Sequence, residues 1–453
     1  MSTIAAISTP NAAGGIGIVR LSGENAIEIA AKCFHPVSGK DVTAMKGYTA
    51  AYGTVWDGEN EIDDGVLLIY RAPHSYTGED TAELCCHGGL FIMQKVLRTV
   101  LSLGAQAAGP GEFTKRAYLN GKMDLSQAES VMNVISAQGA QALTAARNTL
   151  KGNVSKKIND ITSALIGAAA GLAAWADYPD EDIPAVQTDA LRETLEKNGK
   201  ELQTLIRRYD AGRTVTQGVN TVICGKPNVG KSTLMNLLTG FERSIVTSVA
   251  GTTRDIVEET VRVGSTVLRL ADTAGLHETE DLVEIIGVNI AKERIDDADL
   301  ILAVFDSSRE LSDEDRELIE LGKNRKCIAI INKTDLPPVM DTAQITKNIP
   351  CVIELSAKKT ESLTLLEEAL MRLLGTQGLD FNQEILAGER QRDCCVKALE
   401  NINEGIAAID MGLTADAVNV SIDCAVEALL TLTGKKASEE IVNEVFRSFC
   451  VGK

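Results

Sequence analysis

The sequence predicts a multidomain protein: an α+β domain at the amino terminus, then an all-α helical domain with a doubly wound α/β domain inserted into it. The 453 residues are enough for about three domains. Helical periodicity occurs in two blocks, and short β-rich runs alternate with helices between them. Apolar residues make up 44% and charged residues 24%, which is ordinary for a globular protein and excludes a disordered or fibrous chain.

The amino-terminal region, residues 1–118, mixes short apolar runs with glycine and proline. Val66–Tyr70 and Gly15–Val19 have the composition of buried strands. We therefore expect an α+β domain here.

The two helical blocks, residues 119–214 and 377–453, are expected to form one domain. Leucine and isoleucine recur at helical spacing in the first block, at Leu191, Leu195, Leu202 and Ile206. The acidic stretch Asp177–Pro184 should separate two helices. Ile161–Ala176 carries no charge but is shorter than the roughly 20 residues that a membrane span needs. We expect it to be a helix packed on all sides inside a bundle.

The inserted block, residues 215–376, alternates strands with helices, which is typical of a parallel α/β sheet. Gly-containing segments flank it at residues 211–213 and 375–378. The expected strands are Thr221–Cys224, Val267–Ala271, Leu300–Phe305, Cys327–Ile331 and Cys351–Leu355.

Charge and cysteine content limit the possible functions. The formal net charge of −18 excludes a general nucleic-acid coat protein, so RNA contact needs a local basic patch or a cationic partner. The ten cysteines form no Cys-x-x-Cys pair, and no His/Cys spacing resembles a zinc site. No basic residue precedes Arg20, which argues against a targeting segment. We expect a cytoplasmic protein with reduced thiols and no membrane contact.

A phosphate-binding loop follows the first strand of the inserted block. Residues 225–232 read Gly-Lys-Pro-Asn-Val-Gly-Lys-Ser and match G-x-x-x-x-G-K-[ST] between a strand and a helix. Glycines let backbone N–H groups wrap the phosphates, Lys231 reaches the β and γ phosphates, and Ser232 holds Mg²⁺. The positive end of the following helix also favours phosphate.

Four further motifs occur in order, most of them at strand ends, and together they resemble the motif set of Ras-like GTPases. Residues 251–255 (Gly-Thr-Thr-Arg-Asp) supply a second hydroxyl for Mg²⁺, assigned to Thr253, and residues 272–275 (Asp-Thr-Ala-Gly) approach the metal and the γ-phosphate. Asp335 of Asn-Lys-Thr-Asp can accept hydrogen bonds from guanine N1–H and its 2-amino group, which adenine lacks, so the base is predicted to be guanine. Residues 356–358 can meet the guanine carbonyl. The predicted nucleotide site comprises Asn228, Val229, Gly230, Lys231, Ser232, Thr233, Thr247, Ser248, Val249, Ala250, Gly251, Thr252, Thr253, Asp272, Thr273, Ala274, Gly275, Asn332, Lys333, Asp335, Ser356, Ala357 and Lys358.

The position after Asp-x-x-Gly differs from Ras-like switches. A glutamine there orients the attacking water, whereas this chain has Leu276, which cannot hold water. Hydrolysis must therefore recruit another polar residue. The candidates just downstream are Glu278, Glu280, Asp281 and Glu284.

Motifs along the whole chain resemble the MnmE (TrmE) family of tRNA modification GTPases. They include residues 14–23 (Gly-Gly-Ile-Gly-Ile-Val-Arg-Leu-Ser-Gly), 75–83 around Tyr-Thr-Gly-Glu, 110–129 beginning Pro-Gly-Glu-Phe-Thr-Lys-Arg-Ala, and the tail 446–453 (Phe-Arg-Ser-Phe-Cys-Val-Gly-Lys). Ala12-Ala13 and Val451 depart from the usual family residues, but neither change removes a functional group.

The resemblance implies a homodimer formed by the amino-terminal domains, with a pocket for a tetrahydrofolate derivative in its 5-formyl or methylene form. Arg20, Glu83, Lys122 and Lys453 would line this pocket. A carboxylate suits the donor edge of a pterin, and cations suit the folate glutamate. Cys450 is either near the pocket or a small buried tail residue. An MnmG-like flavoprotein partner would bring FAD into a heterotetramer and supply cationic surface, and the complex would place an aminomethyl or carboxymethylaminomethyl group at C5 of the tRNA wobble uridine.

The resemblance also implies how the missing catalytic parts are replaced. Asn228 resembles the potassium-ligating asparagine of this GTPase class, and Thr247, Val249 and Thr252 match the loop that completes the K⁺ site. Glu284 takes the water-positioning role, through a bridging water, when two GTPase domains meet face to face. The catalytic set is therefore Glu284, Lys231 and Thr253.

Two other functions remain open from the sequence. One is a GTPase switch in ribosome assembly without group-transfer chemistry, although such proteins usually carry a basic RNA-binding domain that is not evident here. The other is a folate-dependent enzyme whose GTPase domain regulates action on an unrelated substrate.

Overall fold

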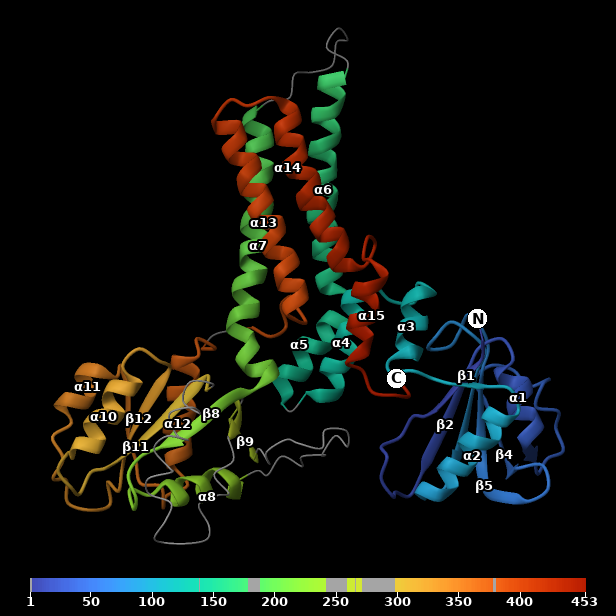
Figure 1. The fold of residues 1–453 in the computed structure, drawn as a ribbon, viewed down its shortest axis with the longest axis horizontal. Coiled ribbons are helices and arrows are strands. Elements are labelled where there is room, and N and C mark those ends of the chain that lie inside the picture. The colour runs from blue at the N-terminus through green and yellow to red at the C-terminus, as the bar shows by residue number, and fades with distance from the viewer. Residues whose placement is uncertain are drawn as a thin grey trace. The chain divides into compact units, whose positions relative to one another are not determined.

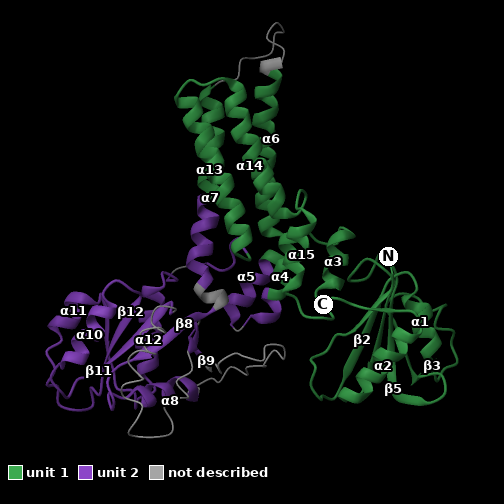
Figure 2. Ribbon diagram, viewed as in Figure 1, with its two compact units in different colours: residues 1–132, 149–202, 387–453 green, residues 133–148, 203–386 purple. Residues whose placement is uncertain are grey.

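The computed structural model describes residues 2–137, 139–177, 188–241, 259–264, 266–270, 298–377 and 380–453. These residues divide into two compact units (Figure 2). Unit 1 contains residues 1–132, 149–202 and 387–453, and unit 2 contains residues 133–148 and 203–386. Each unit is therefore assembled from segments that are distant in sequence.

The first part of unit 1 is a seven-stranded sheet with the order β3-β4-β5-β6-β2-β1-β7. All neighbours pair antiparallel except β1 and β7, which are parallel. The strands are β1 (Ile4–Ile7), β2 (Gly17–Ser22), β3 (Phe34–Pro36), β4 (Thr49–Trp56), β5 (Glu61–Tyr70), β6 (Thr81–Cys86) and β7 (Gln106–Ala107). The predicted strand at 66–70 is thus confirmed within β5, whereas the one predicted at 15–19 overlaps β2 only from Gly17 to Val19.

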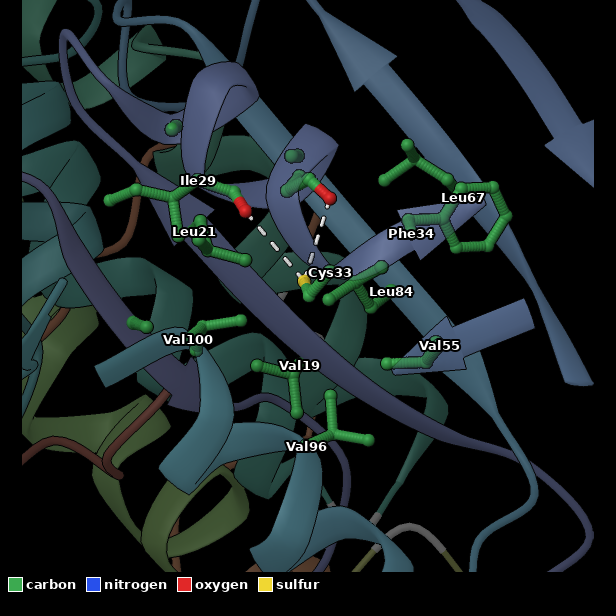
Figure 3. Close-up of a cluster of buried hydrophobic side chains, with 14 of the residues drawn as sticks. Val19, Leu21, Ile29, Cys33, Phe34, Val55, Leu67, Leu84, Val96 and Val100 are labelled. Carbon is green, nitrogen blue, oxygen red and sulfur yellow. Dashed lines mark hydrogen bonds between the residues drawn. The ribbon is translucent and has the colours of Figure 1, made fainter. Parts of the chain in front are cut away.

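One face of this sheet packs against helices α1 (Ala26–Cys33) and α2 (Leu90–Ser102). Alternate residues of the strands, such as Val19, Leu67 and Leu84, are fully buried in this layer (Figure 3). Because side chains alternate along a strand, the residues between them point to the opposite face. Arg20 and Glu83 lie on that opposite face.

The rest of unit 1 is helical, with α6 and α13 each packed along α14 (Figure 1). A separate apolar core joins α4 to α15 through Leu125, Val442 and Phe446. The helices of the chain's all-α part are α3 (Glu112–Leu119), α4 (Leu125–Ser136), α5 (Ala140–Leu150), α6 (Asn153–Asp177), α7 (Thr188–Gln217), α13 (Glu389–Asp410), α14 (Ala415–Thr433) and α15 (Glu439–Arg447). The division between the units falls within α4, α5 and α7, and most of α5 belongs to unit 2.

The prediction that Ile161–Ala176 is packed on all sides was wrong. This segment lies within α6, but Gly167, Ala170 and Gly171 are exposed and Ile166 is 47% exposed. The exposed residues are mostly small, so little apolar surface faces water and the free-energy cost is low. Among the described residues, no helix has the length and apolar character that crossing a membrane would require.

Unit 2 contains a six-stranded sheet with the order β13-β12-β11-β8-β10-β9. Its strands are parallel except β9, which runs antiparallel to β10 at one edge. The strands are β8 (Val219–Cys224), β9 (Glu259–Val263), β10 (Thr266–Leu270), β11 (Leu300–Asp306), β12 (Cys327–Asn332) and β13 (Cys351–Glu354). All five predicted strands of the inserted block are present, and β9 is additional.

Helices cover both faces of this sheet, so the predicted doubly wound architecture is confirmed. Helices α8 (Lys231–Phe241) and α12 (Ser362–Leu373) share one apolar core with it, and α10 (Asp313–Gly322) and α11 (Ala343–Asn348) share the other. In such folds, ligands bind in the crevice beyond the carboxyl ends of the strands.

Candidate functional site

The loops that follow β8, β11, β12 and β13 lie at the carboxyl edge of the sheet in unit 2. The loop 225–230 leads from β8 into α8, so the amino end of α8 faces the same edge as Asn332 and Ser356. A helix amino terminus presents unpaired N–H groups, which favour an anion such as phosphate.

The backbone of the 225–230 loop can be formed only with small residues at two positions. Gly225 has φ +152°, and Gly230 has φ +103°. A Cβ at Gly230 would lie 2.3 Å from Asn332 Nδ2. Asn228, although not glycine, is also left-handed at φ +62°, a conformation that asparagine tolerates better than most residues. The loop therefore curls tightly, as a phosphate cradle requires.

The ammonium group of Lys231 contacts the backbone of this loop. Its Nζ donates hydrogen bonds to the carbonyls of Gly225 at 2.5 Å and Lys226 at 2.8 Å. Burial lowers the pKa of Lys231 from its ordinary value. An anionic phosphate would be a stronger acceptor than either carbonyl, so the ammonium can exchange one set of partners for the other.

Asn332 and Lys333 join the loops of this edge to one another. Asn332 Nδ2 donates to Val229 O at 2.9 Å, and its Oδ1 accepts from Ala357 N at 2.9 Å. Lys333 Nζ donates to Asn228 O and to Asp306 Oδ2, both at 2.6 Å. Burial would raise the pKa of Asp306, but hydrogen bonds from Lys333 and Ser308 outweigh it and lower that pKa. The structure thus brings together the three motifs that the sequence places at residues 225–232, 332–335 and 356–358.

Asp335 is held as an ionised acceptor. Its Oδ1 accepts from Ser356 Oγ at 2.8 Å, and its Oδ2 lies 3.3 Å from Lys358 Nζ. These hydrogen bonds, from Ser356 first and Lys358 second, lower the pKa of Asp335. Its side chain is 25% exposed, so a base that reaches it can pair with the carboxylate.

Several predicted site residues lie outside the described residues. They are Thr247, Ser248, Val249, Ala250, Gly251, Thr252, Thr253, Asp272, Thr273, Ala274, Gly275, Leu276, Glu278, Glu280, Asp281 and Glu284. Their roles stay predictions.

Three predicted site residues near the loop that the structure does describe carry oxygens that suit a hard cation bound together with phosphates. Ser232 and Thr233 are exposed at the start of α8, and Asn228 is exposed in the loop. Hydroxyl and amide oxygens suit Mg²⁺ and K⁺ better than zinc, and Mg²⁺ commonly takes most of its ligands from water and phosphate. Within the described parts of the chain, no cluster of three or more His, Cys, Asp or Glu residues could hold a metal by itself.

A second candidate site is a cavity of about 320 Å³ in unit 1. Its lining residues are Arg20, Tyr70, Tyr76, Thr81, Glu83 and Lys453. Arg20 and Glu83 are cross-strand partners on β2 and β6, and Arg20 Nε donates to Glu83 Oε1 at 2.7 Å. Tyr70 and Thr81 are cross-strand partners on β5 and β6. The cavity therefore lies against the sheet face opposite α1 and α2.

The tail of the chain closes onto this cavity. Gly452 O accepts from Ser8 Oγ at 3.1 Å and from Arg20 Nη1 at 3.4 Å, and Val451 forms a β-bridge with Pro110. Burial and the nearby Arg20 guanidinium lower the pKa of Lys453, against the opposing effect of Glu83. Cys450 is exposed, and its carbonyl accepts from Gly111 N. The buried-residue interpretation of Cys450 is therefore wrong.

Lys122 does not line the cavity. Its Nζ donates to Pro73 O at 3.0 Å, in the loop that carries Tyr76. Arg116 also holds that loop, because its Nη1 lies 3.2 Å from Glu79 Oε2. Arg116 itself is only 4% exposed. Three of the four predicted pocket residues thus share the cavity, while Lys122 contacts its supporting loop.

Sequence reasoning missed Tyr70, Tyr76 and Thr81 in the cavity, and Lys226, Asp306 and Asp315 around the phosphate-binding loop. Tyr76 stands inside the 75–83 motif, so its position was available as a signal. Thr81 lies in the same motif, and Lys226 lies in the 225–232 motif. The positions of Tyr70, Asp306 and Asp315 depend on strand register and on contacts between loops, which no local pattern reveals.

The doubly wound sheet with these loops at its carboxyl edge defines a P-loop GTPase domain. Two family models match the chain: "GTP-binding protein TrmE N-terminus" over residues 3–122 and "MnmE helical domain" over residues 125–450, a range that spans the inserted domain. The chain is 40% identical over 457 residues to tRNA modification GTPase MnmE of Thermoanaerobacter pseudethanolicus, covering 100% of this chain and 99% of that protein. It is 38% identical over 454 residues to the MnmE of Clostridioides difficile, covering 100% and 99%. The chain therefore belongs to the MnmE family of tRNA modification GTPases.

Solved structures match the chain in part. The G domain of the T. maritima FeoB iron transporter is 26% identical, covers 34% of this chain and 98% of its own, and has a TM-score of 0.26. Aquifex aeolicus Era bound to GDP.AlF4⁻ is 26% identical, covers 40% and 66%, and has a TM-score of 0.25.

Proposed function

We propose that this chain hydrolyses GTP and, with an MnmG-like flavoprotein, installs an aminomethyl or carboxymethylaminomethyl group at C5 of the wobble uridine of certain tRNAs. The observation that supports it best is the cavity that unites Arg20 and Glu83 with Lys453, 433 and 370 positions along the chain from them. Mass spectrometry of tRNA nucleosides from cells with and without the gene tests it. Unchanged wobble uridines in the deletion strain would refute the proposal.

A tetrahydrofolate derivative, in its 5-formyl or methylene form, is proposed as the cavity's ligand and supplies a one-carbon unit. The side chains fit that ligand. Glu83 can accept from the pterin amino edge, and Arg20 and Lys453 can pair with carboxylates. Tyr70 and Tyr76 provide flat apolar surface for a ring system. Lys122 would act only indirectly, through the loop at Pro73.

The proposed assembly contains two copies of this chain, the flavoprotein partner and tRNA. The amino-terminal domains form a homodimer, and the flavoprotein carries FAD and completes a heterotetramer with it. Since this chain has a net charge of −18, we expect the partner to supply much of the cationic surface for tRNA. The complex is proposed to be cytoplasmic.

The proposed domain bounds are those of the sequence analysis: residues 1–118, 119–214, 215–376 and 377–453. Within the GTPase domain, Lys231 contacts the β and γ phosphates, and Ser232 with Thr253 binds Mg²⁺. Asn228, Thr247, Val249 and Thr252 are proposed to bind K⁺. Asp335 selects guanine.

The Asp335→Asn variant should prefer xanthosine triphosphate over GTP. Its amide presents a donor where guanine needs an acceptor, whereas xanthine offers a carbonyl there. Losing a hydrogen bond to a charged group costs roughly 1.5–3 kcal/mol, or about one to two decades of affinity. Competitive titration with a fluorescent guanine nucleotide measures the change.

A matched control for this variant is Asp341→Asn, because Asp341 lies in the same connection between β12 and β13 and its Oδ1 accepts from the local Ala343 N. It should bind GTP like the unmodified chain. If Asp335→Asn also binds GTP unchanged, the guanine assignment is wrong.

A GTPase switch in ribosome assembly is the alternative function. It requires no folate site, so titration of the purified chain with 5-formyltetrahydrofolate separates the two. Binding that disappears in Glu83→Ala favours the modification enzyme, and absence of binding favours the switch.

A further inference from the structure

An ion pair joins Lys226, the second residue of the phosphate-binding motif, to helix α10. Lys226 Nζ lies 2.6 Å from Asp315 Oδ2 and donates to Ser312 Oγ at 3.1 Å. The side chain of Asp315 is fully buried at 0% exposure, and that of Lys226 is 17% exposed. Salt screens a pair this buried only weakly, so the contact is a fixed part of the fold.

Asp315 also caps its own helix, but capping does not account for its burial. Ser312 N donates to Asp315 Oδ2 at 2.9 Å, and Asp315 N donates to Ser312 Oγ at 3.4 Å, which forms a capping box. Such a box needs no cation. Asp315 Oδ1, however, is buried without a hydrogen-bond donor in the described part of the chain. This arrangement costs free energy that a solvent-exposed cap would avoid, which suggests that the link to Lys226 has its own use.

The main chain of Lys226 contacts Lys231, which connects this pair to the nucleotide. Lys231 Nζ donates to Lys226 O and Gly225 O. When the Lys231 ammonium donates to a bound phosphate in place of these carbonyls, both carbonyls lose their donor. The peptides at 225–226 must then keep their place without Lys231. The side chain of Lys226, fixed to α10, can hold them.

We propose that Lys226 and Asp315 are positioning residues for nucleotide binding, which hold the Gly225 and Lys226 peptides in place when Lys231 turns from their carbonyls to the phosphates. The proposal rests on GTP binding at the loop. A purely electrostatic role predicts the opposite sign. If Asp315 only neutralised Lys226, its removal would free a cation beside the phosphates and tighten binding. Positioning predicts weaker binding.

The test uses the full chain and four variants: Asp315→Asn, Lys226→Met, the double variant and Lys226→Arg. Affinities for a fluorescent GDP and a slowly hydrolysed GTP analogue are measured by titration, and thermal unfolding is followed without nucleotide. Each single change should weaken nucleotide binding about tenfold, the effect of losing one charge-assisted contact. The double variant should lose little more than either single variant, because the two residues act as a pair. Lys226→Arg should restore most of the affinity that Lys226→Met loses.

Asp313→Asn is the matched control, since Asp313 stands in the same first turn of α10 and its ion pair with Arg316 is solvent-exposed. It should leave nucleotide affinity unchanged. Tighter binding by Asp315→Asn, additive losses in the double variant, or a lower melting temperature with unchanged affinity would each overturn the proposal. If Asp315→Asn does not fold, Lys226→Met against Lys226→Arg still decides, because Lys226 reaches the surface.

Discussion

Removal of residues 450–453 is expected to abolish tRNA modification and weaken folate binding, while GTP affinity stays the same. The tail supplies Lys453 to the cavity, and Gly452 O accepts from Arg20, which pairs with Glu83. Deleting it opens the cavity and removes one of its cations. The described contacts of these four residues are with unit 1, whereas the nucleotide loops are in unit 2. Nucleoside mass spectrometry and two ligand titrations measure the three quantities.

Point variants separate the possible roles of the tail. Gly452 has φ +96°, and a Cβ there would lie 2.4 Å from Ile7 O, so Gly452→Ala should displace the tail and reproduce the truncation. Cys450→Ser keeps the shape and tests thiol chemistry alone. Full modification by the truncated chain would remove the tail from the proposed pocket. Full activity of Cys450→Ser would assign the tail's importance to position rather than to sulfur.

Local patterns were sufficient to predict the α/β unit. Buried parallel strands are continuous apolar runs, such as Leu300–Phe305, and the motifs at 225–232, 332–335 and 356–358 come at or just after the ends of β8, β12 and β13. The Asn332 contacts to Val229 and Ala357 then follow from topology, because parallel strands deliver their carboxyl ends to one edge. This is why the sequence predicted which motifs meet.

The cavity of unit 1 was not predictable in the same way. Arg20 and Glu83 pair because β2 and β6 are neighbours in register, although 63 residues separate them in sequence. Strand order in an antiparallel sheet depends on turns and packing over the whole domain, which local periodicity does not encode. Only the family motifs pointed to these residues, and they could not show that Lys122 contacts Pro73 instead of the cavity.

Helix exposure was the other limit. The uncharged run at 161–176 predicted a fully buried helix, because composition gives no information about how many neighbours a helix has. Alanine and glycine are compatible with either burial or exposure, so the composition of this run does not predict whether it is buried. The exposure of Ile166 is seen only once the packing of α6 is known.

Hydrolysis of GTP by this chain is expected to be slow in sodium and on the order of 100-fold or more faster in potassium, since a finger arginine, which K⁺ would replace, is worth roughly 10³–10⁵ in rate. A bound potassium ion supplies positive charge beside the phosphates, and preorganised charge contributes most to the acceleration of phosphoryl transfer. Asn228 is suited to hold it. Its backbone is fixed by Lys333 at 2.6 Å, and its side chain is exposed.

Four measurements at equal ionic strength distinguish this mechanism from its alternatives. Turnover in sodium and potassium tests the ion, and equal rates would refute it. Asn228→Gly keeps the left-handed backbone at φ +62°. It should lose the difference between the two salts while nucleotide affinity changes little, because Lys231 and the loop amides still bind the phosphates. Glu284→Ala should lose hydrolysis in both salts and retain GTP binding. Potassium with GDP and aluminium fluoride should also bring two GTPase domains together in the unmodified chain, measured as a shorter distance between labels on the two GTPase domains. A fully active Glu284→Ala variant would transfer the water-positioning role to Glu278, Glu280 or Asp281, because Leu276 has no group that can hold a water molecule.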